Sequence, residues 1–116
     1  TWPPLAGYEC DGAPIDAFNA STGIATLSAW ADESGTPDGY QLLAACPLDA
    51  RWQELPPRER HAAAEGMHAA TLGVFTRNGT VFSAGTTDWA QVLGAGRDRR
   101  VERITRNVLD RLLRAQ

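Results

Sequence analysis

The residues best suited to chemistry lie in two short stretches, around Glu9 and around Gly85. Glu9 stands near the end of an apolar run, Leu5–Cys10, and Asp11 lies two residues after it. A carboxylate at the end of a strand suits general acid or base catalysis, because partial burial favours its protonated form near neutral pH. Asp11 would strengthen that effect through like-charge repulsion. The alternative is that Glu9 only accepts hydrogen bonds from the loop that follows it.

The second stretch begins with a predicted β-hairpin. Two β-prone segments, Thr71–Phe75 and Thr80–Ala84, flank Arg77, Asn78 and Gly79. An Asn-Gly pair in this position predicts a tight turn, because a type I′ turn needs positive φ at both central residues.

A turn from strand to helix is predicted next, at residues 85–89. Thr86 or Thr87 is expected to cap the helix, with Asp88 in its first turn. Open α/β sheets commonly place their sites where a strand ends in small residues and leads into a helix. Gly85 and Thr86 are therefore candidates for the wall of a substrate pocket, although a glycine needed only for the turn would look the same.

Other familiar sites find little support in the sequence. His61 and His68 lie seven residues apart, but Gly66 interrupts any helix joining them, so no metal site is predicted within this chain. Cys10 and Cys46 form no CxxC pair and are interpreted as free thiols in a reducing, cytoplasmic compartment.

Composition and charge narrow the class of protein. The 116 residues, 43% of them hydrophobic, suit one small domain or part of a larger one, and no apolar run nears the length of a membrane span. All eleven basic residues are Arg; residues 1–56 carry a net charge of −7 and residues 57–116 a net charge of +4. Such asymmetry can mark a nucleic-acid surface. We expect a solvated face, or one that meets the acidic half, because acids alternate with the arginines.

The remaining elements follow from hydrophobic periodicity. Strands are predicted at Leu5–Cys10, Gly23–Ala31 and Tyr40–Cys46, with loops at 12–23 and 32–39 and a weak helical turn at 58–65. The second and third strands could pair as a hairpin with a long loop. This order favours an α/β or α+β fold.

The strongest helix is the last. An apolar stripe at helical spacing is expected to face the sheet: Val101, Ile104, Val108, Leu109, Leu112 and Leu113. Asp98 stands at the N-cap position, and Glu102 in the first turn complements the helix dipole.

Three segments resemble the C-terminal region of the large subunit of N,N-dimethylformamidase and its relatives. They are GYECD (Gly7–Asp11), TVFSAGTTDW (Thr80–Trp89) and ITRNVLDRLL (Ile104–Leu113). The segments also resemble the end of glutamine-amidotransferase-like and trehalose-utilisation-like domains. The resemblance implies a flavodoxin-like sheet, with residues 1–116 forming one domain at the C-terminal end of a larger protein.

The resemblance further implies an amide-hydrolysing enzyme with a mononuclear iron. Two tyrosines and a glutamate bind that iron, in segments upstream of this region, so Tyr8 and Tyr40 are not expected to be ligands. Glu9 matches the glutamate of the family's Gly-aromatic-Glu-x-Asp motif and would act on a water that attacks an amide. This chain would supply one wall of the site, hold no cofactor itself and be inactive alone.

The rival hypothesis is a non-catalytic structural or interaction module. Its acidic first half and its Arg-bearing helix would contact another domain of the same protein or another copy of the chain. Neither hypothesis predicts a membrane or nucleic-acid partner.

Overall fold

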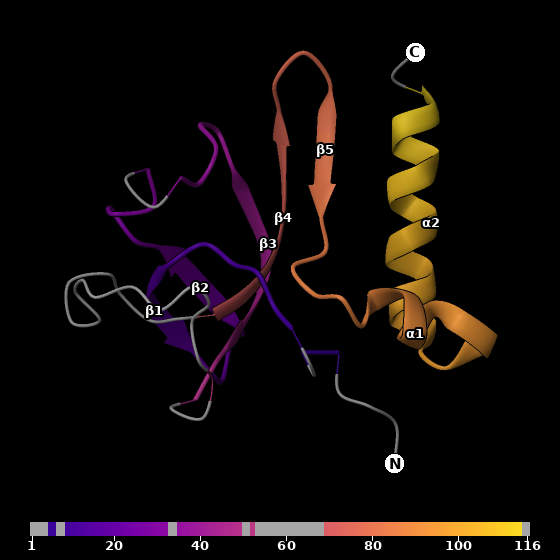
Figure 1. Ribbon diagram of the computed structural model, residues 1–116, viewed down its shortest axis with the longest axis horizontal. Helices are drawn as coiled ribbons and strands as arrows, with labels where there is room; N and C mark the ends of the chain where they lie inside the picture. Colours follow the sequence, from indigo (N-terminus) through magenta and orange to yellow (C-terminus); the bar gives the residue numbers. More distant parts are fainter. Residues whose placement is uncertain (1–4, 7–8, 33–34, 50–51, 53–68, 115–116) are drawn as a thin grey trace.

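The computed structural model describes residues 5–6, 9–32, 35–49, 52 and 69–114. In these residues the chain forms two small sheets and two α-helices (Figure 1). The elements are β1 (Ile15–Asn19), β2 (Ile24–Leu27), β3 (Gln41–Pro47), β4 (Ala69–Thr76), β5 (Thr80–Ser83), α1 (Trp89–Leu93), a 3₁₀ turn (Gly94–Gly96) and α2 (Arg99–Arg114). The mixed α/β class is thereby confirmed.

Both sheets are antiparallel. β1 pairs with β2 as a ribbon, and β3, β4 and β5 form a second sheet in that order. A flavodoxin-like sheet is built mainly from parallel strands, and every strand pair in the described ranges runs the other way. The α+β form of the prediction therefore suits these residues better than a doubly wound sheet.

The first ribbon corrects the prediction of a loop over residues 12–23. The Asn19 side-chain oxygen accepts hydrogen bonds from the Ser21 amide (3.0 Å), the Ser21 hydroxyl (2.7 Å) and the Thr22 amide (3.1 Å). These bonds form an Asx turn, and Gly23 completes it with a φ of +71°. The polar residues that predicted a loop thus form the turn of a hairpin. Its two strands are β1 and β2.

Two other strand predictions are also revised. The strand expected at Leu5–Cys10 is reduced, in its described residues, to one bridge between Cys10 and Thr86. The strand at 23–31 is shortened to β2, whereas Tyr40–Cys46 is confirmed as β3 within one residue. These two do not form a hairpin with each other, because β2 pairs with β1 and β3 pairs with β4. The helical turn predicted at 58–65 lies outside the described residues.

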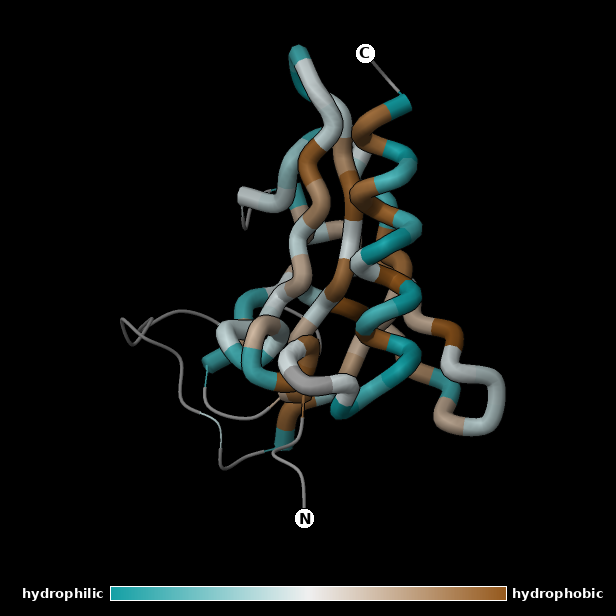
Figure 2. The backbone as a smooth tube through the Cα atoms, turned by 90° about the vertical axis from the view of Figure 1, so that its right-hand side faces the viewer, coloured by the Kyte–Doolittle hydropathy of each residue, from teal (hydrophilic) through white to brown (hydrophobic). Residues whose placement is uncertain are grey.

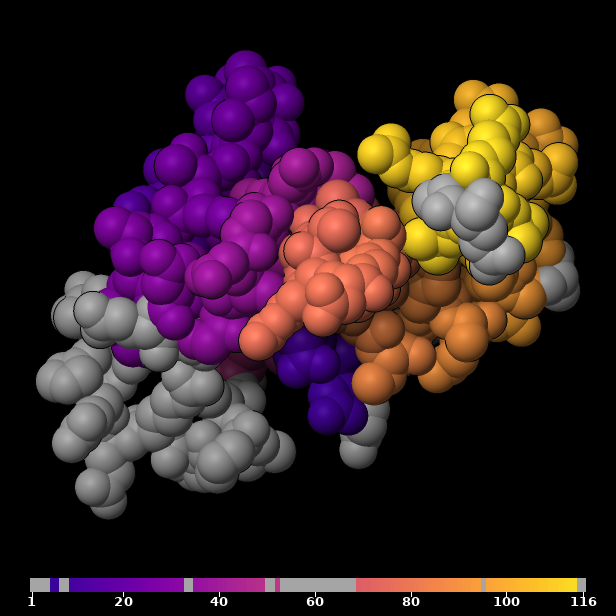
Figure 3. Space-filling view, turned by 90° about the horizontal axis from the view of Figure 1, so that it is seen from above, coloured from indigo at the N-terminus to yellow at the C-terminus, as the bar shows by residue number. Residues whose placement is uncertain are grey.

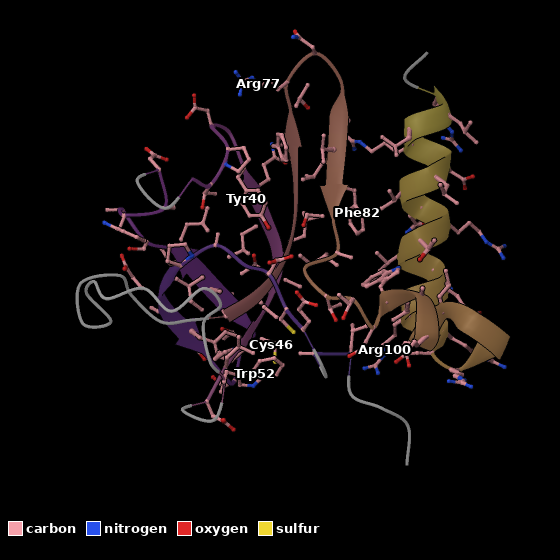
Figure 4. The ribbon with its side chains drawn as sticks, in the orientation of Figure 1. Tyr40, Cys46, Trp52, Arg77, Phe82 and Arg100 are labelled. Atoms are coloured by element: carbon pink, nitrogen blue, oxygen red, sulfur yellow. The ribbon has the colours of Figure 1, made fainter. Side chains whose placement is uncertain are left out.

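Gly73 in β4 makes room for an aromatic ring. A Cβ built on Gly73 would collide with the ring of Tyr40, which therefore lies directly over this glycine (Figure 4). The Tyr40 hydroxyl shares a 3.2 Å hydrogen bond with the hydroxyl of Thr71, a residue only 2% exposed. The Tyr40 ring thus packs against one face of β4 near its centre.

The predicted hairpin between β4 and β5 is confirmed. Thr76 pairs with Thr80, and Val74 pairs with Phe82, so the connection spans residues 77–79. Asn78 has a φ of +55° and Gly79 a φ of +153°, so both are positive as predicted, but the connection has three residues and is not the two-residue type I′ turn. In Figure 3 the tip of this hairpin lies between the first half of the chain and α2.

Replacing Gly79 with valine should lower the free energy of unfolding by about 1 kcal/mol or more, because a β-branched residue strongly disfavours positive φ. Chemical denaturation would measure the loss. Gly94→Val is the matched control, since Gly94 has a φ of −64° and open space at its Cβ position. Equal losses in the two variants would contradict the role of positive φ.

The two helices begin at different kinds of cap. α1 starts after Asp88, so the N-cap is one residue beyond Thr87 and two beyond Thr86, and Asp88 is the cap rather than a residue of the first turn. The Thr86 hydroxyl instead accepts a 3.1 Å hydrogen bond from the Asp88 amide and so shapes the turn before the helix. At α2 the prediction is confirmed: Asp98 accepts the Arg100 amide at 2.8 Å, and Glu102 lies in the first turn.

The cap of α2 should make stability depend on acid pH. The Arg100 side chain and then its backbone amide hold the pKa of Asp98 at about 2, below the ordinary value of 3.8. A carboxyl whose pKa is lowered by folding stabilises the native state above that ordinary value and loses its contribution as pH falls through the lowered one. We therefore expect stability to fall between pH 3.8 and about 2. Thermal unfolding followed by circular dichroism should show a shallower fall for Asp98→Asn; identical pH profiles would contradict the assignment.

Candidate functional site

The segment that carries Glu9 lies beside the turn that follows β5. The Asp11 amide donates to the Gly85 carbonyl at 3.1 Å, and the Thr87 amide donates to the Glu9 carbonyl at 3.2 Å. Between these two bonds lies the bridge of Cys10 with Thr86. The structure therefore brings together the backbones of two stretches that are separated by about two thirds of the chain.

This segment occupies the edge of β4 that β5 leaves open. β5 ends at Ser83, and further along β4 the Thr71 amide donates to the Asp11 carbonyl at 3.2 Å. The Thr71 hydroxyl then accepts the Ala13 amide at 2.9 Å. Residues 10–13 thus continue the sheet edge, which satisfies backbone groups that would otherwise be buried without a partner.

Gly85 lets the strands approach at this point. It has a φ of +64°, and a Cβ built on it would overlap the carbonyl oxygen of Thr71 and lie 2.9 Å from that of Asp11. Only glycine adopts such a conformation without strain and leaves the required space. Glycine is therefore required at position 85 by its positive φ and by the close approach of the Thr71 carbonyl oxygen.

The predicted side chains are arranged differently from the expectation. Glu9 and Asp11 are exposed, which corrects the partial burial expected of Glu9. The Thr86 hydroxyl donates to the Leu5 carbonyl at 2.6 Å. Because side chains alternate along a strand pair, the bridge places Thr87 rather than Thr86 on the face that Glu9 and Asp11 share.

Cys10 is a member of this edge that sequence reasoning did not select. Burial raises the pKa of its thiol; a hydrogen bond with the Thr86 hydroxyl opposes the rise, and Cys46, Asp88 and Asp11 add to it. Both cysteines are free thiols, as predicted. Since the thiolate is the nucleophile, the raised pKa makes Cys10 less nucleophilic than an ordinary cysteine.

The described residues do not fit a metal ion. Among them, no three His, Cys, Asp or Glu side chains lie close enough together to hold one. His61 and His68 lie outside the described part of the chain. The resemblance itself puts the iron ligands elsewhere, so no catalytic step through iron is derived from this chain.

The second candidate surface is on α2, which stands alongside the β4–β5 hairpin (Figure 2). Phe82 projects from β5 toward the helix (Figure 4), and its ring meets that of Trp89 edge to face, with centroids 6.0 Å apart. The Trp89 indole donates to the Thr105 hydroxyl at 3.1 Å, and Val101 is buried. These contacts anchor the first half of α2.

The apolar stripe of α2 is covered only in part. Leu109 is 55% exposed and Leu113 is 70% exposed, so the predicted burial of Leu109 against the sheet is wrong. The other predicted core positions, Ile104, Val108 and Leu112, are half-buried. The stripe spans too wide an arc for one narrow hairpin to cover, and its far edge faces outward.

The helix that carries this open edge is basic. α2 carries six arginines, all exposed, against the acids Glu102 and Asp110, and Arg100 pairs with Asp98 at 2.7 Å. None of the described helices is long and apolar enough to cross a membrane. The outward surface of α2 is therefore a short leucine edge within a basic helix.

Comparison with protein-family models, curated proteins and solved structures found no match. The resemblance to the dimethylformamidase family stays a prediction.

Proposed function

We propose that this chain is a protein-interaction module in which α2 is the docking element. The observation that carries the proposal is the exposure of Leu109 and Leu113, one helical turn apart on the same edge. Isolated exposed leucines are common on protein surfaces, but adjacent ones on a helix that is anchored at only one end mark an interaction site more specifically. Covering the exposed half of each side chain would contribute about 1 kcal/mol.

The covering surface belongs to another folded unit, either a further domain of the same protein or a separate chain. A net charge of −3 and the acids of the first half disfavour nucleic acid as the partner. A phosphate backbone would also leave the leucines uncovered. The free thiols support a reducing compartment, for which we propose the cytoplasm.

Site-specific photo-crosslinking tests this function. A photoreactive residue is placed at position 109 or 113 of the protein in its native cells, and at Asn107 on the polar side of α2 as the matched control. We expect positions 109 and 113 to crosslink to one identified segment, of a separate chain or of a further domain of the same protein, and position 107 not to. The same products from all three positions would overturn the proposal.

A second candidate function rests on the edge formed by residues 9–11 and 85–87. There Glu9 lies beside Thr87, Asp11 lies beside Gly85, and the Glu9 carboxylate is open to a ligand. In this function the chain is the C-terminal domain of a longer, dimethylformamidase-like protein. Its flavodoxin-like sheet would lie in the rest of that protein, because the described strands of this chain pair antiparallel. Glu9 would orient or deprotonate a water molecule that attacks an amide carbonyl. The two functions are compatible, since α2 would then dock on the rest of that protein.

A further inference from the structure

We propose that the surface covering α2 is an acidic amphipathic helix of another protein or domain. This inference rests on the proposed function and specifies its partner. Its two supports are the shape of the open edge of α2, defined by Leu109 and Leu113, and the charge of the helix that carries it.

The shape favours a helix. Leu109 and Leu113 are separated by four residues, and side chains at this spacing form the ridges that pack into the groove of a second helix. α2 has 16 residues, which provides about 24 Å of helix for such packing. The half-buried Val108 and Leu112 continue the stripe toward the hairpin, so the partner helix would extend an apolar contact that already exists.

The charge requires the partner to be acidic. With six arginines and two acids, α2 has a net charge of +4, and Arg106 stands one turn before Leu109. Arginine pairs well with carboxylates, to which it can donate two parallel hydrogen bonds. A partner helix with glutamates beside its own leucines would satisfy both the arginines and the open edge.

A second copy of the chain fits less well. Two α2 helices packed together would place arginine against arginine, which is destabilising. The exposed acids Asp16, Asp32 and Asp38 of the first half lie on β1 and in turns, where they present no helical ridge. The described part of the chain therefore lacks the acidic helix that α2 requires.

The test uses two designed helical peptides with leucines at i and i+4, one flanked by glutamates and the other by lysines. Fluorescence anisotropy should show that the glutamate peptide binds the intact chain, that added salt weakens this binding, and that the lysine peptide does not bind. Leu109→Gln with Leu113→Gln should weaken it at least about tenfold. Asn107→Ala should leave it unchanged.

A charge-reversal variant separates a specific partner from non-specific attraction. Arg103→Glu with Arg106→Glu changes the net charge of α2 from +4 to 0 and should abolish the preference for the glutamate peptide over the lysine peptide, while circular dichroism confirms that the fold is kept. For the unaltered chain, equal binding of both peptides, preferential binding of duplex DNA, or dimerisation where the glutamate peptide does not bind would each overturn the acidic-helix assignment. Equal peptide binding or dimerisation would leave the proposed protein-interaction function standing, whereas a preference for duplex DNA would contradict that function as well. The crosslinks from positions 109 and 113, compared with those from 107, test the proposed function separately.

Discussion

Gly85→Ala should lower the free energy of unfolding by about 3 kcal/mol. Two costs combine there. A non-glycine residue with a φ of +64° is strained by about 1–2 kcal/mol. The new methyl group would also overlap the carbonyl of Thr71, and overpacking of this kind costs about 1–3 kcal/mol. Because the obstacle is backbone, it cannot rotate away.

Gly39→Ala is the control that separates these costs. Gly39 has a φ of +72° but no atom within 4 Å of its Cβ position, so only the conformational cost of about 1 kcal/mol applies. Urea denaturation followed by tryptophan fluorescence would measure both variants. If the two lost the same stability, the close approach of the turn to β4 would be wrong.

The second large effect concerns catalysis and applies to the longer protein of the second candidate function. There, Glu9→Gln should reduce amide turnover about 100-fold, the usual range for loss of a general acid or base. Folding should be unaffected, because the side chain is exposed and glutamine keeps its shape. The present chain alone should neither hydrolyse amides nor bind iron tightly.

Kinetics and melting temperature of the parent protein, Glu9→Gln and Asp16→Asn would decide this point. Asp16 is also an exposed carboxylate, but it lies on β1, away from the edge near Gly85, and its loss should change nothing. Unchanged turnover in Glu9→Gln would remove the catalytic role. It would leave the docking function of α2 untouched.

Elements that depend on interactions between residues close together in the sequence could be predicted from the sequence. The β4–β5 hairpin follows from Asn78 and Gly79, since few other residues adopt positive φ. The start of α2 follows from Asp98, whose side chain reaches an amide two residues away. β3 was recognised from its apolar run. Each of these signals acts over a few residues, so the sequence carried them without knowledge of the rest of the fold.

What the sequence determined about the candidate site is its list of chemical groups: a carboxylate at Glu9, a glycine turn at Gly85, and leucines with arginines on one helix. Tertiary structure alone decided their surroundings. Residues 10–13 close the edge of β4 only because β5 ends early, and this pairing exposes Glu9 rather than burying it. Leu109 is exposed because the hairpin is narrower than the stripe of α2. Periodicity shows which side of a helix is apolar, but burial depends on how much surface distant segments bring to that side.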